Sequence, residues 1–373
     1  QLRKQWTMKK QLWPQLLEQA GYDTYFSGKW HVKAEAGKVF KVARHIRPGM
    51  PNQTPKGYDR PHKGKPDPWS PYDKSFGGFW KGGKHWSEVL GDDAVDYLGM
   101  ASKKDNPFFM YLAFNAPHDP RQSPKKFVEM YPLDKISLPK PFYPLYPHNI
   151  GSNRIRDEKL APFPRTKYSV KVNRQEYYAI ITHLDEQVGR ILDALKKSGK
   201  EDNTWIFFTA DHGLACGHHG LMGKQNMYDH SVRVPFMVVG PKVTADKRIA
   251  SPIYLQDVMP TTLELAKVEK PKHVDFKSLV PMVRGESSKH YSSIYGAYTM
   301  TQRMVTVGKD KLIVYPKINK TLLFNMKDDP LETKDLSKEP GKRAMIAKLM
   351  KELKALQKVT GDPLDLTMTA GTK

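Results

Sequence analysis

Three short polar clusters in this sequence contain residue types that hold oxyanions and move protons. The first is Gly28-Lys-Trp-His31, the second contains His118 between two prolines, and the third begins with Asp211-His212. Lysine offers a compact positive charge to anionic oxygens, and histidine transfers protons near neutral pH. A carboxylate beside an imidazole can bind a metal or orient a base. As a set, these groups suit hydrolysis of a sulfate or phosphate ester.

Each cluster also has a structural explanation. Asp211 and His212 could form a turn in which the carboxylate bonds nearby backbone. His118 alone could be a hydrogen-bonded structural histidine, and Lys29 could be an ordinary solvated lysine. The position of the clusters in the predicted fold therefore decides between the two interpretations.

A glycine-rich stretch, Gly217-His-His-Gly-Leu-Met-Gly-Lys224, follows the third cluster. It could be a flexible loop with incidental charge, or a lid that brings Lys224 and His219 to an anion, because glycine permits close backbone approach. Cys216, the only cysteine, precedes it. No catalytic spacing surrounds this thiol, so we interpret it as a small inert residue, and no internal disulfide is possible.

Each of the three clusters directly follows a predicted strand, at 24–26, 108–114 and 205–209. Helices predicted at 87–100 and 176–197 alternate with these strands. This order predicts an α/β fold, with a mostly parallel sheet sandwiched by helices. Ligands bind at the carboxyl ends of strands in such sheets, so we expect the three clusters to converge at one edge.

Two further features concern the surroundings of this sheet. The apolar runs at 108–114, 205–209 and 232–240 are typical of strands that are buried on both faces. Segments 32–85 and 120–170 are rich in proline, glycine and charged residues, and we interpret them as long excursions that carry surface and substrate contacts.

The pattern changes after residue 287. Short strands joined by turns are predicted at 304–307, 311–315 and 321–325, before a charged helix at about 340–358. We therefore expect a catalytic α/β domain over residues 1–287 and a small C-terminal α+β subdomain over residues 288–373.

Charge also bears on function. The chain of 373 residues has 61 Lys+Arg against 39 Asp+Glu, a net charge of +22. A basic surface of this kind attracts a sulfated or carboxylated polysaccharide, although it could serve solubility alone. No basic helix or aromatic platform supports nucleic-acid binding. No apolar run is long enough to predict a membrane span, and nothing in the sequence indicates an oligomeric state.

Taken in order, the motifs resemble those of the formylglycine-dependent sulfatases of the alkaline phosphatase-like superfamily, in the branch of iduronate-2-sulfatase and choline-sulfatase relatives. The resemblance extends over almost the whole chain and rests on GYDTYFSGKWH (21–31), NPFFMYLAFNAPHDP (106–120), YYAIITHLDEQVGRILDAL (177–195), DNTWIFFTADHG (202–213) and HHGLMGKQNMYDHSVRVPFMVVGP (218–241). It implies an alkaline phosphatase-like fold, a sulfuric ester hydrolase and a sulfated small molecule or polysaccharide as substrate. It also implies a periplasmic or secreted location.

The resemblance implies roles for individual residues. Lys29 and Lys224 would hold the sulfate oxygens, and His219 of the glycine-rich loop is a further candidate sulfate contact. His31 would support the formylglycine, and His118 would act at the leaving oxygen.

The resemblance further implies one divalent metal, usually Ca²⁺, with Asp211 and His212 among its ligands. Formylglycine arises in the family from a Cys/Ser-x-Pro-x-Arg motif upstream of Gly-Lys-Trp-His, near two further metal-binding aspartates. The sequence shows neither, and it begins at Gln1 without an initiator methionine. We therefore expect an N-terminal truncation and no turnover by this chain alone, with a non-catalytic relative as the alternative.

Other functions remain open at this point. Sulfate and phosphate are both tetrahedral, so the same groups could serve a phosphate or phosphonate ester hydrolase of the same fold. A non-catalytic binder of sulfated glycans would also retain the lysines.

Overall fold

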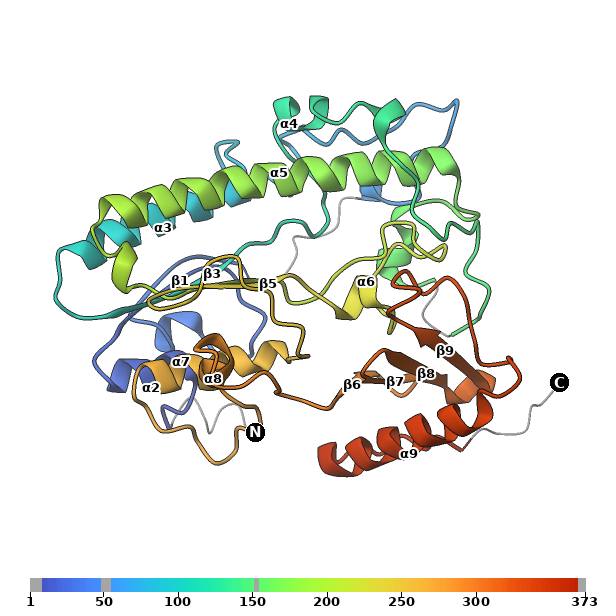
Figure 1. Ribbon diagram of the computed structural model, residues 1–373. Helices are drawn as coiled ribbons and strands as arrows, with labels where there is room; N and C mark the ends of the chain where they lie inside the picture. The colour runs from blue at the N-terminus through green and yellow to red at the C-terminus, as the bar shows by residue number, and fades with distance from the viewer. Residues whose placement is uncertain (1–8, 48–54, 151–153, 368–373) are drawn as a thin grey trace.

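The computed structural model describes residues 9–47, 55–150 and 154–367. Its central feature is a parallel sheet in the order β2-β1-β3. These strands are Asp23–Lys29 (β1), Val42–Arg47 (β2) and Phe108–Ala113 (β3). Helices α3 (Trp86–Ser102) and α5 (Lys167–Lys197) cover one face, and α2 (Trp13–Gln19), α7 (Val258–Leu265) and α8 (Val280–Val283) lie on the other (Figure 1). The parallel sheet sandwiched by helices confirms the predicted fold class.

Alternate side chains of β1 form the core on both faces of this sheet. Tyr25 packs against Tyr97 of α3, with ring centroids 5.1 Å apart. Phe26 points to the opposite face and contacts Phe40, with ring centroids 5.0 Å apart. This two-sided burial fixes β1 rigidly, and with it the residues that follow its carboxyl end.

Strand β2 corrects the interpretation of 32–85 as one excursion without strands. Its sequence, VARHIR, has no regular apolar alternation, and Arg44, His45 and Ile46 are exposed. Because β2 pairs only with β1 among the described residues, it is an edge strand and has little apolar surface to bury.

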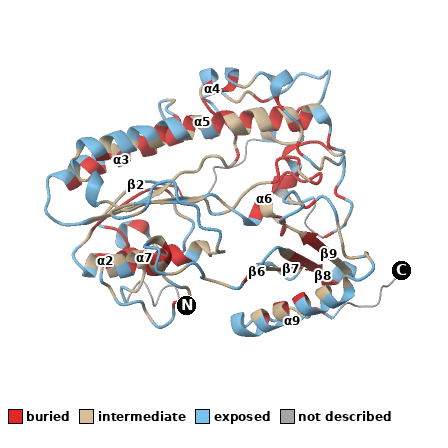
Figure 2. Cartoon of the chain, in the orientation of Figure 1, coloured by how far each residue is buried: buried red, intermediate tan, exposed pale blue. Residues whose placement is uncertain are grey.

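A second sheet contains β4 (Ile206–Thr209) and β5 (Phe236–Val239), which pair antiparallel. The prediction that 232–240 is a strand buried on both faces is wrong, because Met237 and Val239 are 55% and 60% exposed. Tyr111 of β3 is also 40% exposed. Within the described residues, β4 and β5 pair only with each other and β3 pairs only with β1, and the side chains of all three strands are intermediate or exposed (Figure 2).

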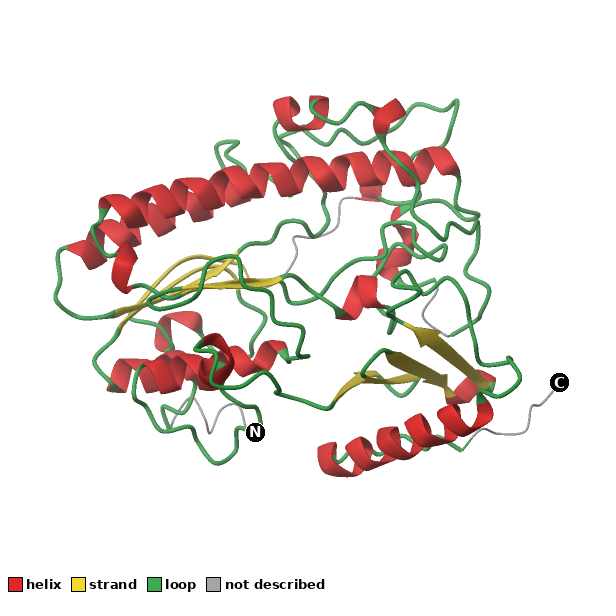
Figure 3. Cartoon of the chain, in the orientation of Figure 1, coloured by secondary structure: helices red, strands yellow, loops and turns green. Residues whose placement is uncertain are grey.

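The C-terminal part is an antiparallel meander followed by a helix (Figure 3). Its elements are β6 (Ser293–Tyr298), β7 (Gln302–Val307), β8 (Asp310–Tyr315), β9 (Lys320–Asn325) and α9 (Arg343–Thr360). Leu349 and Leu353 of α9 pack on one face of this sheet, and Tyr228 from the α/β region packs on the other. Strand β6 was not predicted, and the domain boundary at residue 287 stays a prediction.

None of the helices within the described ranges combines the length and apolar composition needed to cross a bilayer.

Candidate active site

The carboxyl ends of β1 and β4 deliver the first group of predicted residues. Lys29 ends β1, and its Nζ lies 3.4 Å from Oδ2 of Asp211, which follows β4. Nε2 of His212 lies 3.6 Å from the same oxygen. The Asp211 side chain is 66% exposed, so this group opens to solvent.

Gly28 permits Lys29 to end the strand in this position. Gly28 has a φ of +106°, and a Cβ built on it would lie 2.1 Å from the carbonyl oxygen of Ala113 on β3. Any larger residue would force β1 and β3 apart.

The second group lies after β3 and in the glycine-rich loop. Nζ of Lys224 donates to Nε2 of His118 at 2.8 Å. Nδ1 of His118 lies 2.7 Å from Oδ1 of Asp119, so the imidazole is held between an acid and an ammonium group. Lys224 also lies 3.4 Å from the buried carboxylate of Asp157.

The two groups meet through their histidines. The ring centroids of His118 and His212 are 6.3 Å apart. The structure therefore brings together Lys29, His118, Asp211 and His212, whose positions at strand ends predicted this, and it adds Lys224 from the glycine-rich stretch.

Buried acids hold the loop that carries Lys224. Glu158 accepts hydrogen bonds from the backbone N–H groups of Met222 and Gly223, at 2.7 and 2.8 Å. Its carboxylate also pairs with the buried guanidinium of Arg165 at 2.7 Å. The backbone before Lys224 is thus anchored, which contradicts the interpretation of this stretch as a flexible loop.

His31 and His219 do not join the cluster among the described residues. His31 is exposed just beyond β1. His219 is 4% exposed, and its Nε2 lies 3.0 Å from the backbone oxygen of Glu332. Its ring stacks on Tyr228 with centroids 4.0 Å apart. The roles predicted for both histidines stay predictions.

Cys216 is 4% exposed, and burial raises the pKa of its thiol. Because a nucleophilic cysteine must be an accessible thiolate, these properties agree with an inert residue.

Charges around Asp211 and His212 set their protonation. Although the Asp211 side chain is largely exposed, the surrounding protein partly withdraws its carboxylate from water, which raises its pKa. The charges of His212, Lys29 and Lys224 outweigh this effect and hold the pKa below its ordinary value. Burial lowers the pKa of His212, and Asp211 opposes this effect only in part. At neutral pH the pair is therefore an ionised carboxylate beside a neutral imidazole.

This pair has the donor chemistry of a partial metal site. Nδ1 of His212 donates to the Gly213 backbone oxygen at 3.0 Å, which leaves a lone pair on Nε2 facing the Asp211 carboxylate. Two lone-pair donors that face each other suit a cation between them. Among the described residues no group of three or more His, Cys, Asp or Glu is arranged around a metal position, so the pair supplies only part of a coordination shell.

Sequence reasoning missed Asp119, Asp157 and Glu158. Asp119 is adjacent to His118, and that adjacency was an available signal. Asp157 and Glu158 lie in the segment 120–170, where no periodicity marks them as buried.

Two family models and several known proteins are similar to this chain. The family described as Sulfatase matches residues 7–268, and the family described as "N-sulphoglucosamine sulphohydrolase, C-terminal" matches residues 217–359. A choline-sulfatase from Rhizobium meliloti is 30% identical over 346 residues, covering 87% of this chain and 66% of the relative. An arylsulfatase from Clostridium perfringens is 29% identical over 260 residues, covering 68% of this chain and 53% of the relative.

The chain thus spans between half and two thirds of the length of these two relatives. A solved protein in complex with its substrate, D-glucosamine-2-N,6-O-disulfate, has a TM-score of 0.71 and 22% identity, covering 95% of this chain and 83% of that one. A phosphonate monoester hydrolase from Agrobacterium radiobacter also has a TM-score of 0.71, with 17% identity, covering 93% of this chain and 80% of that one. Both likenesses show the fold.

Proposed function

We propose that this chain, which belongs to the sulfatase family, binds the sulfate ester of a carbohydrate between Lys29 and Lys224 for hydrolysis. The observation that carries the proposal is the convergence of two ammonium groups and one imidazole from three separate segments. The His118–Lys224 contact of 2.8 Å and the Lys29–Asp211 contact of 3.4 Å define its two sides.

The two lysines supply the charge that an anionic ester needs. The side chains of Lys29 and Lys224 are 20% and 18% exposed, so each ammonium is partly withdrawn from water. A partly buried charge interacts with an oxyanion more strongly than a solvated one does. Both lysines contact carboxylates in the structure, and we infer that a sulfate group shares these ammonium groups when substrate binds.

His118 is positioned to serve the leaving oxygen. Asp119 fixes the ring through Nδ1, and Nε2 faces the Lys224 ammonium. When the sulfate engages Lys224, Nε2 becomes available to hold a proton at the sugar oxygen that leaves. A positioned acid of this kind contributes about 10²–10⁴-fold to the rate.

The remaining components follow from family membership. Sulfatases in general use a formylglycine, which supplies the nucleophile, and a divalent metal. We assign Asp211 and His212 as two ligands of this metal, because the pair presents a carboxylate oxygen and an imidazole nitrogen with a lone pair. The family resemblance, and not this donor set, makes Ca²⁺ the proposed metal. We assign His31, exposed beside Lys29, to the formylglycine.

The proposed substrate class is a sulfated polysaccharide or small molecule met in the periplasm or outside the cell. The support for it is the net charge of +22 together with the relatives named above. The phosphonate monoester hydrolase has the same TM-score to this chain as the protein bound to the disulfated glucosamine. A phosphate or phosphonate ester is therefore the second candidate substrate.

The test compares two alanine variants of the protein, each expressed from the complete reading frame of its gene. Lys224→Ala should lower kcat/KM for an aryl sulfate by about 10²-fold or more, because it removes a charge from the developing oxyanion. Lys135→Ala is the matched control, because its side chain is 78% exposed and lies 3.9 Å from its only ion-pair partner in the described chain, Asp134. Equal activity of the two variants would contradict the proposal.

A further inference from the structure

Asp119 holds the imidazole of His118 on the side opposite Lys224. Oδ1 of Asp119 lies 2.7 Å from Nδ1 of the ring, and the Asp119 backbone oxygen lies 3.1 Å from the same nitrogen. The side chains of His118 and Asp119 are 9% and 12% exposed, so the contact is largely withdrawn from water. A carbonyl oxygen and an ionised carboxylate only accept hydrogen bonds, so Nδ1 carries a proton and donates to them.

The opposite nitrogen of the ring is the one that exchanges protons. Nε2 of His118 accepts from the Lys224 ammonium group at 2.8 Å, and an ammonium group has only donors. Nε2 therefore presents a lone pair in this arrangement, and the other tautomer would break the contacts at both nitrogens. Asp119 thus determines that the ring binds and releases its mobile proton at Nε2.

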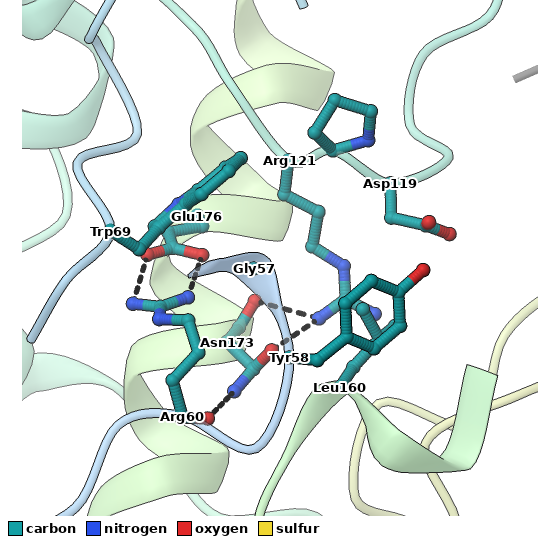
Figure 4. A pocket seen from close by; sticks show the side chains of 10 residues that line it. Gly57, Tyr58, Arg60, Trp69, Asp119, Arg121, Leu160, Asn173 and Glu176 are labelled. Carbon is teal, nitrogen blue, oxygen red and sulfur yellow. Dashed lines mark hydrogen bonds and ion pairs between the residues drawn. The ribbon is translucent and has the colours of Figure 1, made fainter. Parts of the chain in front are cut away.

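Two arginines line a cavity together with Asp119 (Figure 4). Arg60 is engaged by Glu176, whose two carboxylate oxygens accept from it at 2.7 and 2.8 Å. Figure 4 shows the carboxylate of Asp119 turned away from Arg121. The charge of Asp119 is therefore directed to His118, which lies 2.7 Å away.

We propose that Asp119 is a positioning residue that allows cleavage of sulfate esters with poor leaving groups, such as those of sugar alcohols. When the S–O bond breaks, the leaving oxygen takes a proton from Nε2 of His118, and the ring becomes neutral with its remaining proton on Nδ1. Before this step the ring holds both protons, the second taken up from water after the sulfate has engaged Lys224. The Asp119 carboxylate balances the positive charge of that ring.

The contribution of Asp119 depends on the leaving group. A strongly basic oxygen leaves slowly unless it gains a proton, whereas a weakly basic one leaves without it. The loss caused by removing the charge of Asp119 should therefore increase with the basicity of the leaving oxygen. This inference rests on the proposed function, because it assumes that His118 serves the leaving oxygen.

The experiment measures kcat/KM for two aryl sulfates, using the protein expressed from the complete reading frame of its gene. 4-Nitrophenolate leaves without a proton, because the nitro group delocalises its charge, whereas the more basic phenolate of phenyl sulfate gains from one. Asp119→Asn keeps the shape of the side chain and removes its charge. It should lower kcat/KM for phenyl sulfate by about 10²-fold and for 4-nitrophenyl sulfate by less than about tenfold.

Three further variants separate charge from structure. Asp134→Asn is the matched control, because its side chain is 73% exposed, and it should leave both kcat/KM values unchanged. Asp119→Glu retains the carboxylate and should keep the ratio of the two values closer to that of the wild type. Asp119→Ser removes the charge with a smaller side chain and should show the same selective loss, so it serves if Asp119→Asn fails to fold.

Equal losses for the two esters in Asp119→Asn, or no loss for phenyl sulfate, would overturn the inference, because a purely structural residue affects both esters alike. Failure of the proposed function would look different, because His118→Gln would then lose the same factor with both esters. A selective loss in His118→Gln beside equal losses in Asp119→Asn would overturn the inference alone.

Discussion

The loop that presents Lys224 depends on one buried carboxylate, that of Glu158. The side chains of Glu158 and Arg165 are 3% and 0% exposed, and they lie 2.7 Å apart. Both oxygens of Glu158 also accept backbone N–H groups of the loop. Glu158→Gln keeps the shape of the side chain but removes its charge.

The expected loss of stability follows from these contacts. The amide of the variant offers one acceptor oxygen in place of two, and its NH₂ group meets a backbone N–H or the Arg165 guanidinium. Arg165 keeps its backbone acceptors but becomes a buried charge without a counter-ion. Breaking a buried ion pair from one side costs about 3–5 kcal/mol, so Glu158→Gln should lower the free energy of unfolding by that amount.

The assay is urea unfolding at neutral pH, with the midpoint and slope fitted separately. Glu35→Gln is the matched control, because its side chain is 72% exposed and pairs with Lys38 on the surface. The control should change the free energy of unfolding by less than about 1 kcal/mol. If the two variants unfold within about 1 kcal/mol of each other, Glu158 does not anchor the loop as described.

Two further substitutions address β1 and the acid stability of the fold. Gly28→Ala should lower the free energy of unfolding by about 3 kcal/mol or more in the same urea assay, because the new Cβ would lie 2.1 Å from the carbonyl oxygen of Ala113. Gly37→Ala is the control and should not lower it, because the space around Gly37 is open. Burial lowers the pKa of His219 to about 4, so the unfolded chain binds its proton first and stability falls as pH drops from about 6.5 toward 4. Between pH 7 and 5 the wild type should lose about 2 kcal/mol more than His219→Gln, measured as free energy of unfolding, and equal losses would contradict neutral burial of this histidine.

The convergence of the site could be predicted from sequence because it depends on local order. Lys29 ends β1, and His118 and Asp211 come shortly after β3 and β4. The carboxyl ends of these strands lie close together, although β4 belongs to a second sheet and not to the single parallel sheet that was expected. Lys224 was predicted only from its glycine-rich surroundings, and its contact with His118 depends on a loop held by distant residues.

The parts that failed depend on neighbours that the pattern of a segment does not reveal. The apolar sequence of β5 is typical of a buried strand, yet Met237 and Val239 are exposed, because the apolar pattern of a segment does not show which face other parts of the chain cover. The role of His219 stays a prediction, and the structure places its Nε2 3.0 Å from the backbone oxygen of Glu332, a contact with the C-terminal part that its sequence neighbours do not indicate.

The central claim is that the Lys29–His118–Lys224 cluster serves a sulfate ester. The most direct measurement compares kcat/KM for an aryl sulfate with kcat/KM for the matching aryl phosphate. The enzyme is the protein expressed from the complete reading frame of its gene. Faster turnover of the sulfate, lost in Lys224→Ala, is the predicted result. Faster turnover of the phosphate, or sulfate hydrolysis that does not depend on Lys224, would contradict the account.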